Sequence, residues 1–190
     1  AIANDAPVVL GASVPSQALQ FDGTAFVDAG NDAALTFGTT DFTLETWVNV
    51  SQLPSGTSPD DVHFLMDKST SDSVKRFFIE LNPDGQIKFV MVDSPANSGV
   101  LSSTTLLTPG QWQHIAITVD RGGSMSLYID GEIEDTLDIS AFTNDIGSTA
   151  NLIIGSSTVA TRFFKGQMDD VRVYSDVRTA EEIGADIAAP

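Results

Sequence analysis

The chain has 190 residues, of which 42% are hydrophobic, which is enough for one domain with a substantial core. Nine basic against 26 acidic residues give a formal net charge of −17, which disfavours nucleic acid and anionic membrane surfaces as partners. Cysteine is absent, which excludes disulfides and thiolate metal sites, and no apolar run approaches the roughly 20 residues of a membrane helix. The acidic balance fits a solvated, salt-tolerant surface, divalent cation binding, or both.

Short alternating or continuous apolar stretches predict β-strands along nearly the whole chain. In chain order they are ALQFDG (18–23), FTLETWVNV (42–50), VHFLMD (62–67), RFFIEL (76–81), QIKFVMVD (86–93), WQHIAITVD (112–120), MSLYIDG (125–131), NLIIGS (151–156) and MDDVRVY (168–174). The turn sequences NPDG (82–85), DRGG (120–123) and DG (130–131) predict hairpins. Polar loops are expected at 51–61, 68–74, 93–99 and 138–150.

One helix is predicted near the end of the chain, where Thr179 and Glu182 have the spacing of a capping box. Many short strands, hairpin turns and a single terminal helix indicate an all-β fold, an antiparallel two-sheet β-sandwich with one short C-terminal helix. We expect residues 1–15 to form a linker or the end of a preceding repeat, and residues 16–190 to form the sandwich domain.

Six blocks of the sequence, in this order, resemble the laminin-G-like, concanavalin A-like jelly-roll domains. The blocks are ALQFDGTAFVDAG, FTLETWVNV, GQWQHIAITVD, LYIDGE, LIIGSS and FKGQMDDVRVYSDVRTAEEI, and together they extend over about residues 17–187. The resemblance implies two curved antiparallel sheets. Members of that family range from carbohydrate-binding modules and adhesin domains to glycosidases, so the resemblance bears on the fold more than on the function.

A first candidate binding surface is the polar side of two predicted strands. Alternation places Glu45 and Trp47 on the polar side of 42–50, and Trp112 and His114 on the polar side of 112–120. Flat aromatic rings beside hydrogen-bonding groups suit a pyranose, which has an apolar face and equatorial hydroxyls. The alternative is that these rings and the histidine are packing residues, covered by loops or a neighbouring sheet edge.

A second candidate surface lies at the loops around STSDSVKR (69–76) and SSTVATR (156–162). In the resemblance to pentraxins, which hold ligand through calcium bound to loop acids, Asp72 falls in the first loop. The second loop has no carboxylate, which argues against a double calcium site of that type. Arg76 and Arg162 are rare positive charges in an acidic chain and favour an anionic or hydroxyl-rich ligand. Ordinary surface salt bridges are the alternative explanation.

A calcium site is expected from the resemblance of MDDVRVY to the closing strand of the concanavalin A-like glucanases. The aspartate before that run is a calcium ligand in those enzymes, and the matching residue here is Asp169. Asp22, in a strand expected beside the last one, would complete the oxygen shell together with backbone carbonyls. The alternative is that Asp169 only accepts backbone hydrogen bonds.

Catalysis is not expected. The stretch most similar to a glycosidase strand, EIEDTLD (132–138), places Glu132 and Glu134 on one face. It follows an Asp-Gly turn, however, where non-catalytic family members also have an acidic residue. The sequence contains no Gly-x-Ser-x-Gly motif, and its two histidines, His63 and His114, do not have the spacing of a metal site.

The opening NDAPVV resembles the linkers of cadherin-like repeats in large bacterial surface proteins, where such segments bind calcium. This resemblance implies a domain excised from a bacterial adhesin, located extracellularly or at the cell surface, with neighbouring domains in a longer chain. We therefore predict a non-catalytic module that binds a glycan or another cell-surface ligand. The alternatives are a spacer domain of a repetitive adhesin and an accessory module of a secreted polysaccharide-degrading enzyme.

Overall fold

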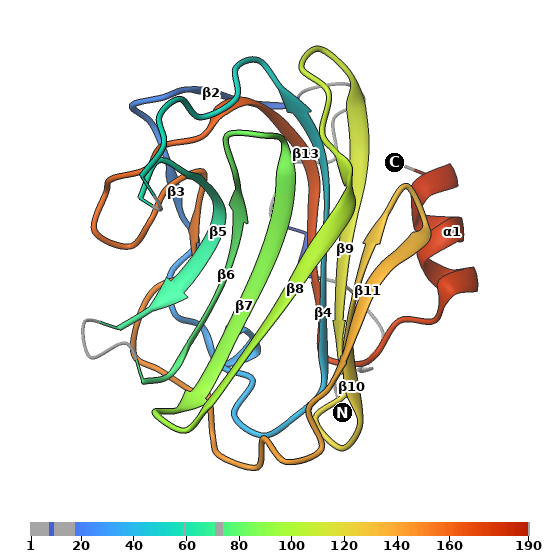
Figure 1. Ribbon diagram of the computed structural model, residues 1–190. Helices are drawn as coiled ribbons and strands as arrows, with labels where there is room; N and C mark the ends of the chain where they lie inside the picture. The colour runs from blue at the N-terminus through green and yellow to red at the C-terminus, as the bar shows by residue number, and fades with distance from the viewer. Residues whose placement is uncertain (1–7, 10–17, 59, 71–73, 190) are drawn as a thin grey trace.

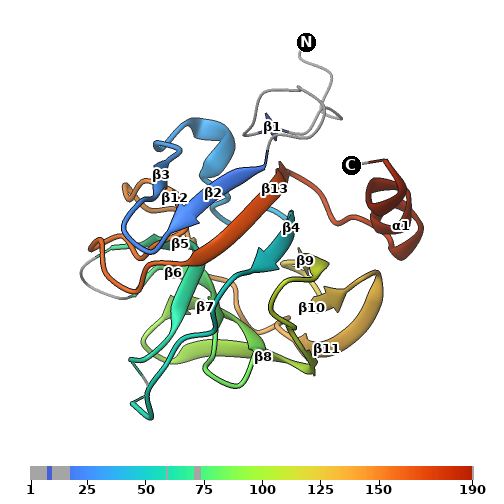
Figure 2. The same cartoon turned by 90° about the horizontal axis from the view of Figure 1, so that it is seen from above.

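The protein is a sandwich of two antiparallel β-sheets, and one helix lies outside the sandwich (Figures 1 and 2). The computed structural model describes residues 8–9, 18–58, 60–70 and 74–189. Within these ranges there are thirteen strands, one α-helix and one short 3-10 helix, η1 (Ala33–Leu35). No helix in the described ranges is long and apolar enough to cross a membrane. The predicted all-β sandwich with a C-terminal helix is confirmed.

The two sheets are formed by strands from distant parts of the chain. Sheet A has seven strands in the described residues. Six of them have the order β1 (Val8–Val9), β13 (Lys165–Tyr174), β4 (Phe42–Val50), β9 (Trp112–Val119), β10 (Ser124–Ile129), β11 (Glu132–Asp138). The seventh, β2 (Leu19–Asp22), also pairs with β13. Sheet B, with six, has the order β3 (Val27–Asp28), β12 (Ile153–Ile154), β5 (His63–Ser69), β6 (Arg76–Leu81), β7 (Gln86–Ser94), β8 (Asn97–Leu106). Apart from β1, the predicted linker 1–15 lies outside the described residues.

The core lies between the sheets and consists of the apolar sides of the alternating strands. The core includes Phe42, Leu44, Val48, Ile115, Ile117 and Val119 from sheet A, and Phe77, Ile79, Leu81, Ile87, Phe89 and Met91 from sheet B. In β6 the alternation is complete, because every second residue is buried and the others remain partly exposed. Since side chains alternate across a strand, Arg76, Phe78 and Glu80 share the outer face of sheet B.

The predicted turns and helix cap have the expected geometry. Asp130 and Gly131 both have positive φ angles, 51° and 82°, which the two-residue turn between β10 and β11 requires. The helix α1 (Ala180–Ala188) begins with the predicted capping box, in which Thr179 and Glu182 exchange side-chain-to-backbone hydrogen bonds. These local features follow from residue chemistry alone.

Strand β8 differs from the sequence expectation. Residues 93–99 were expected to form a long polar loop, but Ser94 pairs with Asn97 across a tight turn that contains Pro95 and Ala96. The ten-residue strand that follows is rich in serine and threonine, and only Leu101 belongs to the core. Its pairing with β7 stabilises a segment that has little apolar alternation of its own.

The two sheets are covered differently on their outer faces. Figure 2 shows α1 on the outer side of sheet A, opposite sheet B. No helix in the described residues lies on the outer face of sheet B. On that outer face Arg76, Phe78 and Glu80 of β6 are partly exposed.

Candidate functional site

The first predicted site, on the outer face of sheet A, is buried. Trp47 pairs with His114 across β4 and β9, and their rings meet edge to face with centroids 5.3 Å apart. Glu45 has no exposed surface, and its Oε2 lies 3.5 Å from His114 Nε2. His114 is only 2% exposed. The three side chains therefore share one face, as predicted, but Glu45 and His114 are not accessible to a ligand.

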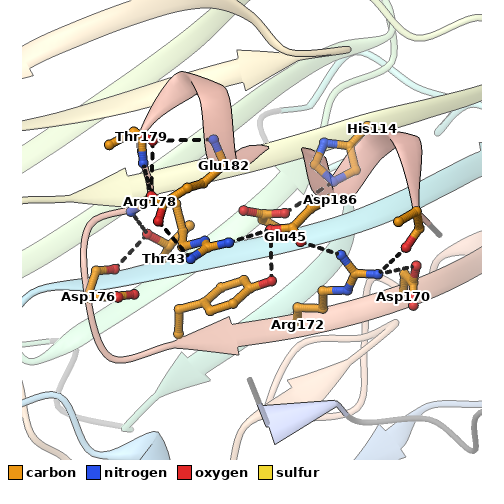
Figure 3. Close-up of polar contacts among 12 residues, drawn as sticks. Thr43, Glu45, His114, Asp170, Arg172, Asp176, Arg178, Thr179, Glu182 and Asp186 are labelled. Atoms are coloured by element: carbon orange, nitrogen blue, oxygen red, sulfur yellow. Dashed lines mark hydrogen bonds and ion pairs between the residues drawn. The ribbon is translucent and has the colours of Figure 1, made fainter. Parts of the chain in front are cut away.

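The burial of Glu45 is explained by the contacts that fix α1 to sheet A. Asp186 of α1 accepts hydrogen bonds from the Tyr174 hydroxyl at 2.9 Å and from Arg178 Nη2 at 3.1 Å. It also forms an ion pair with Arg172 at 3.1 Å, and Figure 3 shows Glu45 among these groups. Burial and the hydrogen bond to Asp186 raise the pKa of Tyr174 to about 12, so its hydroxyl remains protonated. The face of sheet A around Glu45 is a packing surface, the alternative that the sequence left open.

The two predicted calcium ligands, Asp22 and Asp169, are not brought together. Asp22 pairs with Lys165, which is four residues, or about 13 Å of strand, from Asp169 along β13. The carboxylate of Asp22 accepts hydrogen bonds from the backbone and hydroxyl of Thr24 at 2.8 and 2.7 Å, and these lower its pKa. Asp169 accepts a hydrogen bond from the Asp170 backbone at 2.9 Å. Each carboxylate thus accepts hydrogen bonds from its own neighbouring residues, and no group of three potential metal ligands occurs in the described residues.

The stretch at 132–138 forms β11, where Glu134 has a structural role. Its carboxylate accepts four hydrogen bonds from the backbone amides and hydroxyls of Thr104 and Thr105 of β8, at 2.6–2.9 Å. Partial burial would raise the pKa of Glu134, but these hydrogen bonds outweigh it and lower the pKa to about 2. A carboxylate bound in this way connects the two sheets and is not free to protonate a substrate.

The second predicted site is on the outer face of sheet B, where Arg76 and Arg162 each stack on a phenylalanine. Arg76 Cζ lies 5.5 Å from the ring centroid of Phe78, and Arg162 Cζ lies 5.4 Å from that of Phe64. The two rings are themselves neighbours, with centroids 5.0 Å apart. The structure therefore places both arginines on one surface. Asp72, the third predicted member, lies outside the described residues.

Acidic and basic side chains alternate around this pair of rings. Glu80 pairs with Phe64 on one side and with Lys88 on the other. Burial raises the pKa of Glu80, while the positive charges of Lys88 and Arg162 counteract this rise. Arg162 also forms an ion pair with Asp60. We call Phe64, Arg76, Phe78, Glu80, Lys88 and Arg162 the arginine face.

The loop of the second arginine is anchored to the same sheet. Asp67, which pairs with Phe78, accepts hydrogen bonds from the Ser69 hydroxyl and from the Thr158 backbone, the latter at 2.7 Å. Arg162 has a φ angle of 58°, and its carbonyl accepts a hydrogen bond from the Phe64 backbone at 2.9 Å. These contacts hold the 156–162 loop against β5, which pairs with β6, and this explains how Arg76 and Arg162, 86 positions apart, share a face.

The sequence analysis did not identify Phe64, Phe78 and Glu80 as members of the arginine face. The alternation in RFFIEL places Phe78 and Glu80 on the same side as Arg76, so the pattern contained the signal for these two. Phe64 was not predictable in this way, because an irregularity in β5 between Phe64 and Met66 shifts the register.

A family model described as the concanavalin A-like lectin/glucanases superfamily matches residues 21–184. Among curated proteins, none matches the sequence. Many solved structures share the fold, all of those described below at under 25% identity, so the likeness concerns the fold alone.

Three of these structures illustrate the range. A carbohydrate-binding module of the Ruminococcus gnavus IT-sialidase, bound to α2,3-sialyllactose, has a TM-score of 0.71 and 15% identity, covering 90% of this chain and 96% of that one. Domain 4 of an extracellular arabinanase from Geobacillus stearothermophilus, in complex with arabinotriose, has a TM-score of 0.68 and 21% identity. The match covers 90% of this chain and 76% of that one. The binding domain of Paraclostridial Mosquitocidal Protein 1 has a TM-score of 0.69 and 18% identity. The match covers 90% of this chain but only about half (47%) of that one.

Proposed function

Because the chain belongs to the concanavalin A-like lectin/glucanases superfamily, we propose that it is a glycan-binding domain whose ligand lies on the arginine face. The observation that carries this proposal is the pair of guanidinium groups over neighbouring phenylalanine rings on the outer face of sheet B, where Arg76, Phe78 and Glu80 are partly exposed. Glycan hydroxyls are recognised by planar, multidentate hydrogen-bond groups, and guanidinium and carboxylate groups supply donors and acceptors respectively.

Stacking prepares the arginines for a ligand. A guanidinium held over a ring keeps its N–H donors in the plane parallel to the ring, where they remain able to form hydrogen bonds. It also loses side-chain freedom before the ligand arrives, which lowers the entropic cost of binding. Glu80, half-buried between Phe64 and Lys88, supplies an acceptor for a sugar hydroxyl on the same surface.

The structural neighbours support this reading over a purely structural role. One is a carbohydrate-binding module of a sialidase bound to sialyllactose, another is a domain of an extracellular arabinanase in complex with arabinotriose, and a third is the binding domain of a mosquitocidal protein. The domain is, in this proposal, a non-catalytic extracellular module of a longer chain. Whether that chain is an adhesin or a polysaccharide-degrading enzyme would be decided by the domains on either side of it in the full-length gene.

A glycan array with the purified domain tests the proposal. We expect binding to a restricted set of glycans, in the presence of calcium and with a chelator, since the described arginine face contains no metal cluster. Arg76→Gln and Arg162→Gln should each weaken the signal, whereas Lys165→Gln on sheet A should leave it unchanged. Absence of binding to any glycan, with the parent protein folded, would favour the spacer alternative.

A further inference from the structure

The distribution of positive charge over the molecule indicates what kind of glycan the arginine face accepts. The chain contains nine basic residues, all within the described ranges, against 26 acidic ones. Uncharged groups can also donate hydrogen bonds to the hydroxyls of a neutral sugar, so the positions of these nine cations bear on whether the ligand carries a charge.

Four of the nine are engaged in internal structure. Lys68 is 2% exposed and its Nζ donates to Asn31 Oδ1 and the Ala150 carbonyl, both at 2.6 Å. Arg121 is buried and donates to the Asn144 carbonyl at 2.5 Å.

The other two engaged cations hold the C-terminal helix. Arg172 and Arg178 both pair with Asp186 of α1 at 3.1 Å. None of the four is therefore available to a ligand without loss of a structural contact.

Three of the remaining five, Arg76, Lys88 and Arg162, lie on the outer face of sheet B. Lys75 directly precedes Arg76 in the chain, and Lys165 is on sheet A, where it pairs with Asp22. In a chain of net charge −17, the cations not used for folding are thus concentrated at one surface. Glu80 and Asp60 lie among these cations, but an anionic ligand is repelled less at this surface than over the rest of the acidic molecule.

The ion pair between Arg162 and Asp60 shows that a carboxylate fits at this guanidinium. Asp60 is a loop residue whose side chain is 75% exposed, and the Arg162 side chain is 34% exposed. Exposed ion pairs of this kind contribute little to stability, so a carboxylate from a ligand can replace Asp60 at low cost. Arginine binds carboxylates in a bidentate manner, which also gives the contact a defined orientation.

From these observations we infer that the ligand of the arginine face is a glycan that carries a carboxylate, bound by Arg162 and assisted by Arg76, with Asp60 as an internal competitor. The inference rests on the proposed glycan-binding function and adds the chemical class of the sugar. Sialic acids and hexuronic acids both supply such a carboxylate, and the experiment separates these two sources.

The test is a calorimetric titration of the domain with matched acidic and neutral oligosaccharides. Sialyllactose is compared with lactose, and an oligogalacturonate with its methyl-esterified form, each at low and high salt. We expect binding of at least one acidic sugar, at least tenfold tighter than its neutral counterpart. Affinity should fall as salt increases, because the screening length shortens to about 3 Å at 1 M.

Two variants change the predicted contact in opposite directions. Arg162→Gln should reduce affinity for the acidic sugar at least tenfold. Asp60→Asn removes the competing carboxylate and should increase that affinity severalfold. Lys165→Gln, which removes the same charge from sheet A, should change it less than twofold. A loss of folding would not raise affinity, so the gain in Asp60→Asn is independent of any destabilisation in Arg162→Gln.

The outcomes distinguish the inference from the function on which it rests. Equal affinity for acidic and neutral sugars, or an Asp60→Asn variant no tighter than the parent, overturns the inference while glycan binding persists. Absence of binding to all four sugars and to a broader array overturns the proposed function itself. Tighter binding to the acidic sugar with the expected gain in Asp60→Asn supports both.

Discussion

Replacement of Glu134 by glutamine removes the charge from the carboxylate that connects β11 of sheet A to β8 of sheet B. Glutamine keeps the shape of the side chain and one acceptor oxygen, but it lacks the second carboxylate oxygen. The four hydrogen bonds from Thr104 and Thr105 lose their charge-assisted character in the variant. We expect the variant to fold and to be less stable than the parent.

The magnitude follows from the pKa of Glu134, which is lowered from 4.5 to about 2 in the folded protein. At about 1.36 kcal/mol per pKa unit, this corresponds to at most about 3.4 kcal/mol. The carboxylate is only half-buried and water screens it, so we expect a loss of about 1–2 kcal/mol in the free energy of unfolding. For a domain of this size the melting temperature should fall by about 2–8 °C.

The pH dependence has a defined sign. Because the folded pKa is below the unfolded one, the contribution is complete above about pH 4.5 and is lost as the pH falls towards 2. The matched control is Glu132→Gln, which removes the same charge two residues away on the same strand, where the side chain is exposed. Urea unfolding of the three proteins at pH 7 and at pH 3 measures the effect. Equal stability of the two variants at pH 7, or an undiminished deficit of Glu134→Gln at pH 3, would refute the reasoning.

Three further substitutions probe other contacts. Arg121→Ala leaves Asp93 buried without its cation, 3.9 Å away, and should lower the free energy of unfolding by about 3 kcal/mol; a loss below about 1 kcal/mol in urea melts would contradict this. Burial and then the charge of Lys165 lower the pKa of His63 to about 4, so folding opposes its protonation and stability should fall as the pH is lowered from 6.5 to 4. His63→Phe should flatten that part of the stability profile, and an unchanged slope would show that other groups cause it. Thr179→Ala removes the capping hydrogen bond and should cost about 1 kcal/mol, seen as faster amide exchange confined to α1.

Local chemistry was sufficient for most of the strands, for the hairpin turns and for the helix cap, but not for the serine- and threonine-rich β8. The alternation of Arg76, Phe78 and Glu80 with buried neighbours indicated both a strand and its outer face. Asp130 and Gly131 indicated a tight hairpin, because both positions require a positive φ angle that these residues tolerate. Features of this kind depend on residues close in sequence, so they can be predicted from one amino-acid sequence without the structure.

The resemblance of six sequence blocks to a known family predicted the sandwich correctly, but it did not determine which surfaces are open. Alternation indicates which side of a strand a residue occupies and says nothing about what covers that side. Glu45 and His114 share a polar strand side, yet the helix α1, more than 60 residues away in sequence, buries one of them completely and the other almost so. Asp22 and Asp169 were expected to share an ion, and the register of β2 on β13 separates them.

By itself, then, the amino-acid sequence determined most of the secondary structure, the fold class and the scarcity of positive charge. Tertiary structure alone decided where the unused cations meet. Arg76 and Arg162 are separated by 86 positions, and they share a surface because β5 and β6 pair and a loop returns to β5 beside Phe64. Strand register and loop closure are set by packing between distant segments, and this packing is a property of the whole chain that no local pattern encodes.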